Sequence, residues 1–277
     1  MFDKVEKLEH SVIQHGPNND RVYLMKLAEK DSPEIIDKLH HLSVVKKYTK
    51  IFAKVPEKMV DEFLDNDYKK EATIPQFYKG KESAHFVSRF MGAARSFLSF
   101  NKKQKIRKNI EVALLKKDEN NLQRPDADFR PLEHKDAEQL VSLYEKTFKV
   151  YPFPIFDELY IKDTMDKNID YFGAFVDNKL VAASSAEKDA ENKNAEMTDF
   201  ATLPKHRGKN LSYFLLKEME KEMVAQDFKT LFTIARSASI GMNATFARQD
   251  YKFAGTLVNN TYIGEDIESM NVWYKHL

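Results

Sequence analysis

The spacing of apolar residues predicts alternating strands and helices along the whole chain. In the first part, the apolar runs predict strands at 11–14, 21–27, 48–55, 72–78 and 84–90, with helices at 32–47 and 56–64. In the later part they predict strands at 129–132, 171–176, 179–186, 195–202, 230–235, 253–262 and 267–274, with helices at 134–148, 211–227 and 241–248. This alternation is typical of an α/β protein.

A basic helical stretch and a polar stretch separate these two parts. Residues 95–117 have a helical pattern rich in Lys and Arg, and residues 118–128 (DENNLQRPDAD) are polar and turn-rich. We therefore expect a smaller N-terminal α/β domain with a basic linker helix over 1–120 and a second domain over 121–277. A solvated linker is favoured over a site for an acidic partner or RNA.

One short internal similarity links the two parts. Residues 63–69 (FLDNDYK) resemble residues 246–252 (FARQDYK), and each segment follows a strand and a helix and precedes two more strands. We interpret the N-terminal part as a degenerate copy of the C-terminal half of the second domain. Chance similarity is the alternative.

A basic loop joins the strand at 195–202 to the helix that begins near residue 211. Pro204 ends the strand because it has no N–H to donate, and Arg207, Gly208 and Lys209 follow in the turn. At a Gly-containing loop that opens a helix, the backbone N–H groups point outward from the positive end of the helix dipole, where they can bind an anion. The loop therefore predicts a pocket for a ligand that carries a pyrophosphate.

Composition narrows the function classes. The net charge is +1, so there is no bulk electrostatic case for a nucleic-acid or membrane partner. There is no cysteine, which excludes disulfides, a thiolate nucleophile and a Cys-bound zinc. The eight His residues show no metal-ligand spacing, so we expect no metal. Without a signal peptide or an apolar run of about 18 residues, we expect a soluble cytoplasmic protein.

The order of elements, together with the loop 205–210 (KHRGKN), resembles the GNAT acetyltransferase family. The family signature is Arg or Gln, two residues, Gly, one residue, then Gly or Ala. The loop departs from it at Lys205 and Asn210. The resemblance implies an α/β (α+β) GNAT fold with a mixed central sheet, here preceded by the smaller N-terminal domain.

The C-terminal segments 234–251, 255–264 and 267–275 are similar to one GNAT subfamily, the beta-lysine N6-acetyltransferases, and segments 15–16, 19–26 and 50–56 also fit it. The resemblance implies transfer of an acetyl group from acetyl-CoA to the terminal amine of beta-lysine, giving an osmolyte, by direct attack in a ternary complex. The alternatives are another small amine, such as lysine or a polyamine, and a module that senses acyl-CoA without turnover.

The resemblance also implies which residues contact acetyl-CoA. The backbone of Phe200, Ala201 and Thr202 would pair with the pantetheine arm. Asn243 would lie near the pantetheine or the acetyl group. The N–H groups of the loop and first helical turn would hold the pyrophosphate, and these residues are Arg207, Gly208, Lys209, Asn210, Leu211 and Ser212.

Catalysis needs a neutral amine, although an alkyl ammonium has a pKa near ~10.4, so a base is expected. GNAT enzymes often place a carboxylate on the fourth strand, where Glu196 and Asp199 lie. Residues three apart on a strand point to opposite faces, so we expect only one to face the amine. Asp199, next to the cofactor arm, is the first choice; a structural strand-end carboxylate is the alternative.

The leaving thiolate usually receives its proton from a Tyr, but Phe246 stands at that position. A phenyl ring cannot donate a proton. Ser237, Tyr213 or water would then have to serve, or protonation is unassisted.

Polar residues on the last two strands predict a pocket for a small cationic amino acid. The candidates are Asn259, Asn260, Glu268 and Asn271. Glu268 would hold the substrate ammonium, and Arg236 or Arg21 would hold its carboxylate. A bulge at Asn259–Asn260 is the alternative. The N-terminal part would either only pack against the second domain or close this pocket with Arg21 or Lys54. The oligomeric state stays open, a homodimer included.

Overall fold

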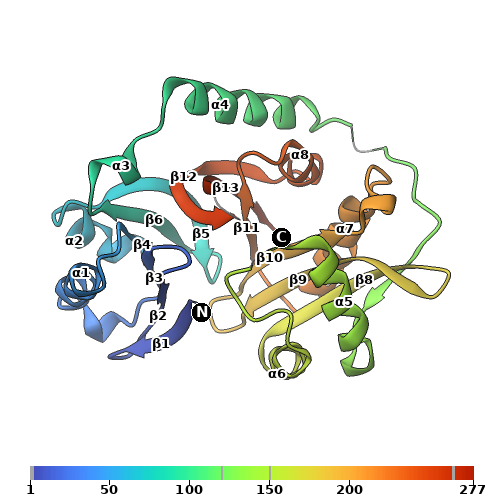
Figure 1. The fold of residues 1–277 in the computed structure, drawn as a ribbon, viewed down its shortest axis with the longest axis horizontal. Helices are drawn as coiled ribbons and strands as arrows, with labels where there is room; N and C mark the ends of the chain where they lie inside the picture. The colour runs from blue at the N-terminus through green and yellow to red at the C-terminus, as the bar shows by residue number, and fades with distance from the viewer. Residues whose placement is uncertain (1–2, 120, 150, 264–265) are drawn as a thin grey trace.

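Thirteen strands form one continuous mixed sheet in the computed structural model, which describes residues 3–119, 121–149, 151–263 and 266–277. The strand order is β1-β2-β3-β4-β6-β5-β12-β13-β11-β10-β9-β8-β7. The first half of the chain forms the left side of the molecule in Figure 1, and the second half forms the centre and right.

The first half contains six strands and two helices packed on them. In chain order these are β1 Lys4–Leu8, β2 Ser11–Gly16, β3 Arg21–Lys26, α1 Ile35–Lys46, β4 Lys50–Pro56, α2 Val60–Leu64, β5 Lys69–Tyr78 and β6 Glu82–Phe90. The sequence did not predict β1. This edge strand is largely exposed and charged (KVEKL), so it carries no apolar run.

The second half follows the predicted order of strands and helices. Its elements are β7 Asp128–Pro131, α5 Ala137–Thr147, α6 Glu158–Lys167, β8 Ile169–Val176, β9 Lys179–Asp189, β10 Asn194–Thr202, α7 Leu211–Ala225, β11 Thr230–Arg236, α8 Ile240–Arg248, β12 Lys252–Ile263 and β13 Asp266–His276. Among the residues that the structure describes, no helix is long and apolar enough to cross a membrane.

The basic stretch predicted as one helix over 95–117 is divided in two. The short helix α3 spans Ala93–Ser96, and α4 spans Phe100–Leu115. Ser99 ends the interruption as the N-cap of α4, because its side chain accepts a hydrogen bond from the backbone N–H of Lys102. In Figure 1, α4 crosses above the sheet toward α8, and the Asn109 Nδ2 donates to the Ser237 carbonyl oxygen at 3.0 Å. The linker helix thus packs against the second half.

The two halves repeat one topology, as the internal similarity predicted. β3 and β4 are parallel and connected through α1, and β10 and β11 are parallel and connected through α7. In each half the next helix is followed by two strands, and the last strand inserts between its predecessor and the parallel pair. The division at residue 120 stays a prediction, because the sheet is continuous.

The similar segments at residues 63–69 and 246–252 have the same local structure. Tyr68 N–H donates to the Phe63 carbonyl oxygen at 3.2 Å, and Tyr251 N–H donates to that of Phe246 at 3.1 Å. The ring centroids of each Phe–Tyr pair lie 5.1 Å apart in an edge-on arrangement. The sequence similarity therefore marks equivalent helix ends.

The halves join where β12 meets β5. Gly255 pairs with Ala72, and a Cβ at Gly255, which has a φ of +153°, would lie 2.1 Å from the Glu71 carbonyl oxygen. Only glycine permits this approach. The apolar core continues across the junction, with the rings of Phe77 and Phe232 5.1 Å apart. The first half is thereby fixed against the second.

Candidate active site

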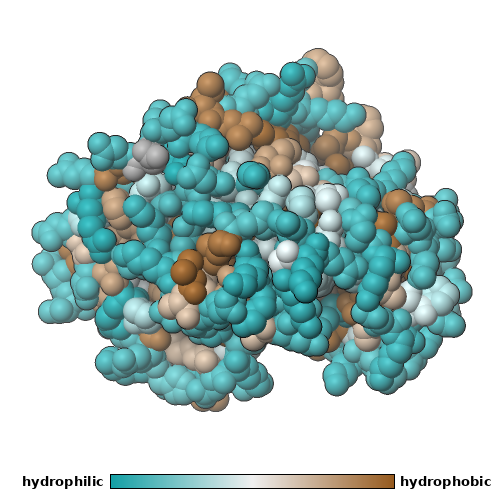
Figure 2. All heavy atoms as spheres, turned by 180° about the vertical axis from the view of Figure 1, so that it is seen from behind, coloured by the Kyte–Doolittle hydropathy of each residue, from teal (hydrophilic) through white to brown (hydrophobic). Residues whose placement is uncertain are grey.

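A cleft of about 2270 Å³ lies between the two halves of the sheet. One wall comes from β2, β3 and β4, and the other comes from β9, β10, β11, α7 and residues 147–149 and 151–155. The volume of the cleft exceeds that of a typical site for one drug-sized ligand, so two ligands can bind at once. Figure 2 shows the molecule from behind, where the surface is mostly hydrophilic and a notch in the lower edge separates the two halves.

The parallel strands β10 and β11 separate inside the cleft. They pair only from Asn194 to Glu196 on β10 and from Thr230 to Phe232 on β11. Beyond these pairs β10 continues to Thr202 and β11 to Arg236, and both continuations line the cleft. The inner backbone edge of β10 is therefore not covered by β11 there. A chain of amides could pair with this edge.

The basic loop between β10 and α7 also opens into the cleft. Arg207, Gly208, Asn210 and Ser212 line it, whereas the side chain of Lys209 is exposed outside it. Gly208 has a φ of +77° and Asn210 has a φ of +60°, so Asn210 is the left-handed residue directly before α7. Asn tolerates this conformation better than most residues with a Cβ. Asn210 therefore fits the conformation of this loop, although the family signature has Gly or Ala at its position.

A bulge in β10 brings both predicted carboxylates to the cleft. The pairing of β10 with β9 shifts between Thr198 and Ala201, and Asp199 has a φ of +56°. A bulge re-aims a side chain relative to regular alternation. The expectation that Glu196 and Asp199 point to opposite faces is therefore wrong, because both line the cleft.

Two hydroxyl groups hold the Asp199 carboxylate. The Ser185 Oγ donates to Oδ2 at 2.5 Å, and the Tyr151 hydroxyl donates to Oδ1. Burial raises the pKa of Asp199, and these hydrogen bonds oppose the rise. Sequence reasoning missed Tyr151 and Ser185. The pair Ser184–Ser185 inside the apolar strand β9 was the available signal for a polar site.

Glu196 lies directly opposite Glu187 in the antiparallel pairing of β10 with β9. Burial raises the pKa of Glu196 to about 8, and the neighbouring Glu187 carboxylate adds to the rise while Lys54 opposes it. Burial also raises the pKa of Glu187. The Lys54 ammonium lies 5.4 Å from the ring centroid of Phe232, which neighbours Glu196 in the β10–β11 pairing. Sequence reasoning did not identify Glu187.

Arg21 reaches the cleft from β3 and is anchored to β12. Its Nη1 donates to the Asn260 carbonyl oxygen at 2.6 Å and to the Thr261 Oγ1 at 3.1 Å. Its guanidinium carbon lies 5.5 Å from the ring centroid of Tyr23. Burial lowers the pKa of Arg21 to about 10, so it stays a cation at neutral pH. The predicted Arg21 is thus at the cleft wall.

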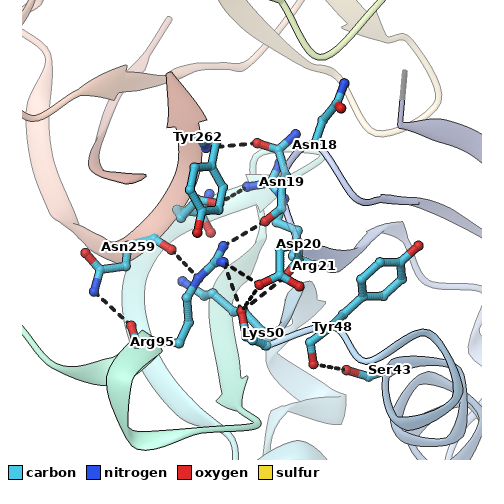
Figure 3. Close-up of polar contacts among 12 residues, drawn as sticks. Asn18, Asn19, Asp20, Arg21, Ser43, Tyr48, Lys50, Arg95, Asn259 and Tyr262 are labelled. Atoms are coloured by element: carbon cyan, nitrogen blue, oxygen red, sulfur yellow. Dashed lines mark hydrogen bonds and ion pairs between the residues drawn. The ribbon is translucent and has the colours of Figure 1, made fainter. Parts of the chain in front are cut away.

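Side chains of the first half also hold the bulge in β12. The Arg95 Nε donates to the Asn259 carbonyl oxygen at 2.8 Å, and the Asn259 Nδ2 donates to the Arg95 carbonyl oxygen at 2.8 Å. The Tyr262 N–H donates to the Asn19 Oδ1 at 3.1 Å, as Figure 3 shows. The Lys50 ammonium donates to the Val258 carbonyl oxygen at 2.8 Å.

Of the polar residues predicted on the last two strands, Asn260 lines the cleft and the other three do not. Asn259 has a φ of +43° in the bulge and bonds to α3, so the bulge interpretation applies to it. Asn271 is fully buried and donates to the Asn243 Oδ1 at 2.9 Å. Glu268 is paired with Arg236 through bonds of 2.6 and 3.0 Å. Glu268 and Arg236 were predicted to bind opposite ends of the substrate, but in the structure they form an ion pair with each other.

Asn243 lies in the interior rather than on the cleft wall, where a place near the pantetheine or the acetyl group was expected. Its Oδ1 accepts hydrogen bonds from Asn271 and from the Trp273 indole N–H, the latter at 2.8 Å. Its Nδ2 donates to the carbonyl oxygens of Arg236 and Ser239. The side chain is fully buried and its polar atoms are occupied. It therefore supports the strand–helix connection.

The phenyl ring of Phe246 is buried and touches the cleft, so no hydroxyl is present at the usual Tyr position. Of the two side chains considered as proton donors, Tyr213 lines the cleft and Ser237 is buried away from it. Across the described parts of the chain, no group of three or more His, Asp or Glu residues could hold a metal ion.

Comparisons with known proteins identify the family of this chain. The pattern of the Acetyltransferase (GNAT) family matches residues 137–251. The chain is 40% identical over 276 residues to the beta-lysine N(6)-acetyltransferase of Methanococcus maripaludis, covering 99% of each chain. It is 33% identical to the protein of that name from Methanosarcina mazei, covering 88% of this chain and 97% of the relative. The N-acetyltransferase YodP of Bacillus subtilis is 36% identical over 75% of this chain and 74% of its own. The chain therefore belongs to the GNAT family of acetyltransferases.

Proposed function

We propose that this acetyltransferase transfers the acetyl group of acetyl-CoA to the terminal amine of beta-lysine, in the cytoplasm, to make a compatible solute. The observation that carries the proposal is the charge distribution across the cleft. One wall presents Arg21 and Lys54, and the other presents Glu187, Glu196 and Asp199. A diamino acid matches this pattern, since its carboxylate suits the cations and its terminal amine suits the carboxylates. The near full-length similarity to two beta-lysine N(6)-acetyltransferases supports this substrate.

The residues around β10 and α7 fit coenzyme A. The uncovered backbone edge of residues 200–202 would pair with the pantetheine amides. The backbone N–H groups of residues 207–212 would hold the pyrophosphate at the start of α7, with charge supplied by Arg207 and by the exposed Lys209. Acetyl-CoA supplies the activated thioester.

Glu196 is our proposed base, in preference to Asp199. A base works best with a pKa near the working pH, which fits the value of about 8 for Glu196. Asp199 accepts two hydroxyl hydrogen bonds, which makes its carboxylate less basic and fixes its position. Glu196 would take a proton from the ammonium, and the free amine would attack the acetyl carbon. The C–N bond forms, the C–S bond breaks, and the released thiolate takes up a proton from Tyr213 or water.

Steady-state release of the CoA thiol with a panel of amines tests this function. The panel contains beta-lysine, α-lysine, putrescine and spermidine. We expect the highest kcat/KM with beta-lysine. A higher value for α-lysine or a polyamine would reassign the substrate within the same chemistry.

A further inference from the structure

Three buried polar atoms at the first-half side of the cleft have no hydrogen-bond partner among the residues that the structure describes. They are the Gln14 Nε2, the Arg21 Nε and the Asn260 Oδ1. The three residues are at most 6% exposed, and all three line the cleft. An unpaired buried polar atom destabilises the folded protein, so such a group at a cleft wall indicates a partner that arrives with the ligand.

The three side chains are neighbours. Arg21 bonds directly to the backbone of Asn260, as described above. Gln14 lies opposite Tyr23 in the pairing of β2 with β3, and Tyr23 is two residues from Arg21 on the same strand face. The ring of Tyr23 and that of Phe52, at 5.7 Å from the guanidinium carbon, hold Arg21 in place. The cluster is thus fixed before any ligand binds.

Their chemistry matches the head of an amino acid. Gln14 and Arg21 each offer an N–H donor, and the donor of Arg21 belongs to a cation, which suits a carboxylate. Asn260 offers an acceptor oxygen, which suits an ammonium. A carboxylate and an amine a few bonds apart occur together at the head of a diamino acid, whereas a plain diamine has no carboxylate.

We propose that Gln14, Arg21 and Asn260 form a subsite for the zwitterionic head of the substrate. The N-terminal half would then determine substrate specificity, while Glu196 on the opposite wall receives the terminal amine. This inference rests on the proposed function, because it assigns the head of the same substrate. It adds Gln14, which the sequence did not indicate, and the side-chain oxygen of Asn260.

The test compares beta-lysine with 1,5-diaminopentane, a diamine without a carboxylate, in the full-length enzyme. The variants are Gln14→Met and Asn260→Leu, which keep side-chain size and remove the polar atoms. We expect each to raise KM for beta-lysine at least about tenfold, since hydrogen bonds to charged groups are strong. The kcat with either amine and the KM for the diamine should change less than about twofold.

Lys26→Met is the matched control. Lys26 is another cation on the same wall, but its ammonium is paired with Glu191 at 3.0 Å. The Lys26→Met variant should therefore keep the wild-type preference for beta-lysine over 1,5-diaminopentane. Equal losses with both amines in Gln14→Met and Asn260→Leu, or no loss with either, would overturn the subsite. A wild-type enzyme that acetylates both amines equally would also overturn it while leaving acetyl transfer intact. A wild type inactive on both would instead reject the proposed function.

Discussion

Glu196 and Glu187 lie directly opposite each other on adjacent antiparallel strands. Two carboxylates in this arrangement repel each other, and burial increases the cost of charging both. Folding gains nothing from such a pair. The arrangement instead suits a proton acceptor, because burial, together with the neighbouring Glu187 carboxylate, raises the pKa of Glu196 to about 8.

Replacing Glu196 tests its role directly. Glu196→Gln keeps the shape of the side chain and removes the proton acceptor. We expect kcat to fall by about 10²–10⁴-fold, the usual contribution of a general base. The KM for acetyl-CoA should stay unchanged. Glu191→Gln, on the exposed connection before β10, is the control and should retain full activity. A kcat within about threefold of wild type for Glu196→Gln would remove Glu196 as the base.

The pH dependence of kcat/KM should follow the ionisation of Glu196. A base acts when deprotonated, so kcat/KM should rise with pH through an apparent pKa of about 8. Lys54 lowers this pKa, so Lys54→Met should move the rise to higher pH. Lys167→Met, at the cleft but paired with Asp163, should not move it. A shift to lower pH, or none, in Lys54→Met would contradict the electrostatic account of the site.

Asn243 should behave as a structural residue. Asn243→Leu leaves the indole N–H of Trp273 and the amide of Asn271 without their acceptor. We expect the free energy of unfolding in urea to fall by at least about 2 kcal/mol, with KM for acetyl-CoA unchanged at a temperature where the variant stays folded. Asn66→Ala, the control, loses one exposed hydrogen bond to the Glu62 carbonyl oxygen and should change the free energy of unfolding by less than about 0.5 kcal/mol. Unchanged stability with a raised KM for acetyl-CoA would instead place Asn243 at the cofactor.

The junction between the halves should depend on Gly255. Gly255→Ala would press a methyl group against the backbone of β5. We expect the free energy of unfolding to fall by about 1–3 kcal/mol, the usual cost of overpacking. At Gly92 an added Cβ meets nothing within 4 Å, so Gly92→Ala is the matched control and should have little effect. If both variants unfold alike, the close approach of β12 to β5 is not what requires glycine.

The order of strands and helices could be predicted from the sequence because it depends on local apolar periodicity. The basic loop at residues 205–210 and the repeat at Phe63 and Phe246 are also local signals, and they indicated the family and the equivalent helix ends. The edge strand β1 was missed because it has no apolar run. A homodimer stays a prediction.

Much of the candidate site depends on long-range geometry that no local pattern contains. The bulge at Asp199 changes which side chains face the cleft, and strand alternation alone placed Asp199 and Glu196 on opposite faces. The opposition of Glu187 to Glu196 requires the register of two strands. Arg236 and Glu268 were assigned to different ends of the substrate, yet adjacent strands bring them together as an ion pair.

The position of the acetyl group in the product tests the central proposal most directly. Beta-lysine has two amines, and the proposed subsite would hold the one near the carboxylate, which leaves the terminal amine for Glu196 on the opposite wall. Wild-type enzyme incubated with acetyl-CoA and beta-lysine, with the product identified by NMR, should give N6-acetyl-beta-lysine alone. Acetylation at the amine next to the head, or CoA binding without any acetylated product, would contradict it.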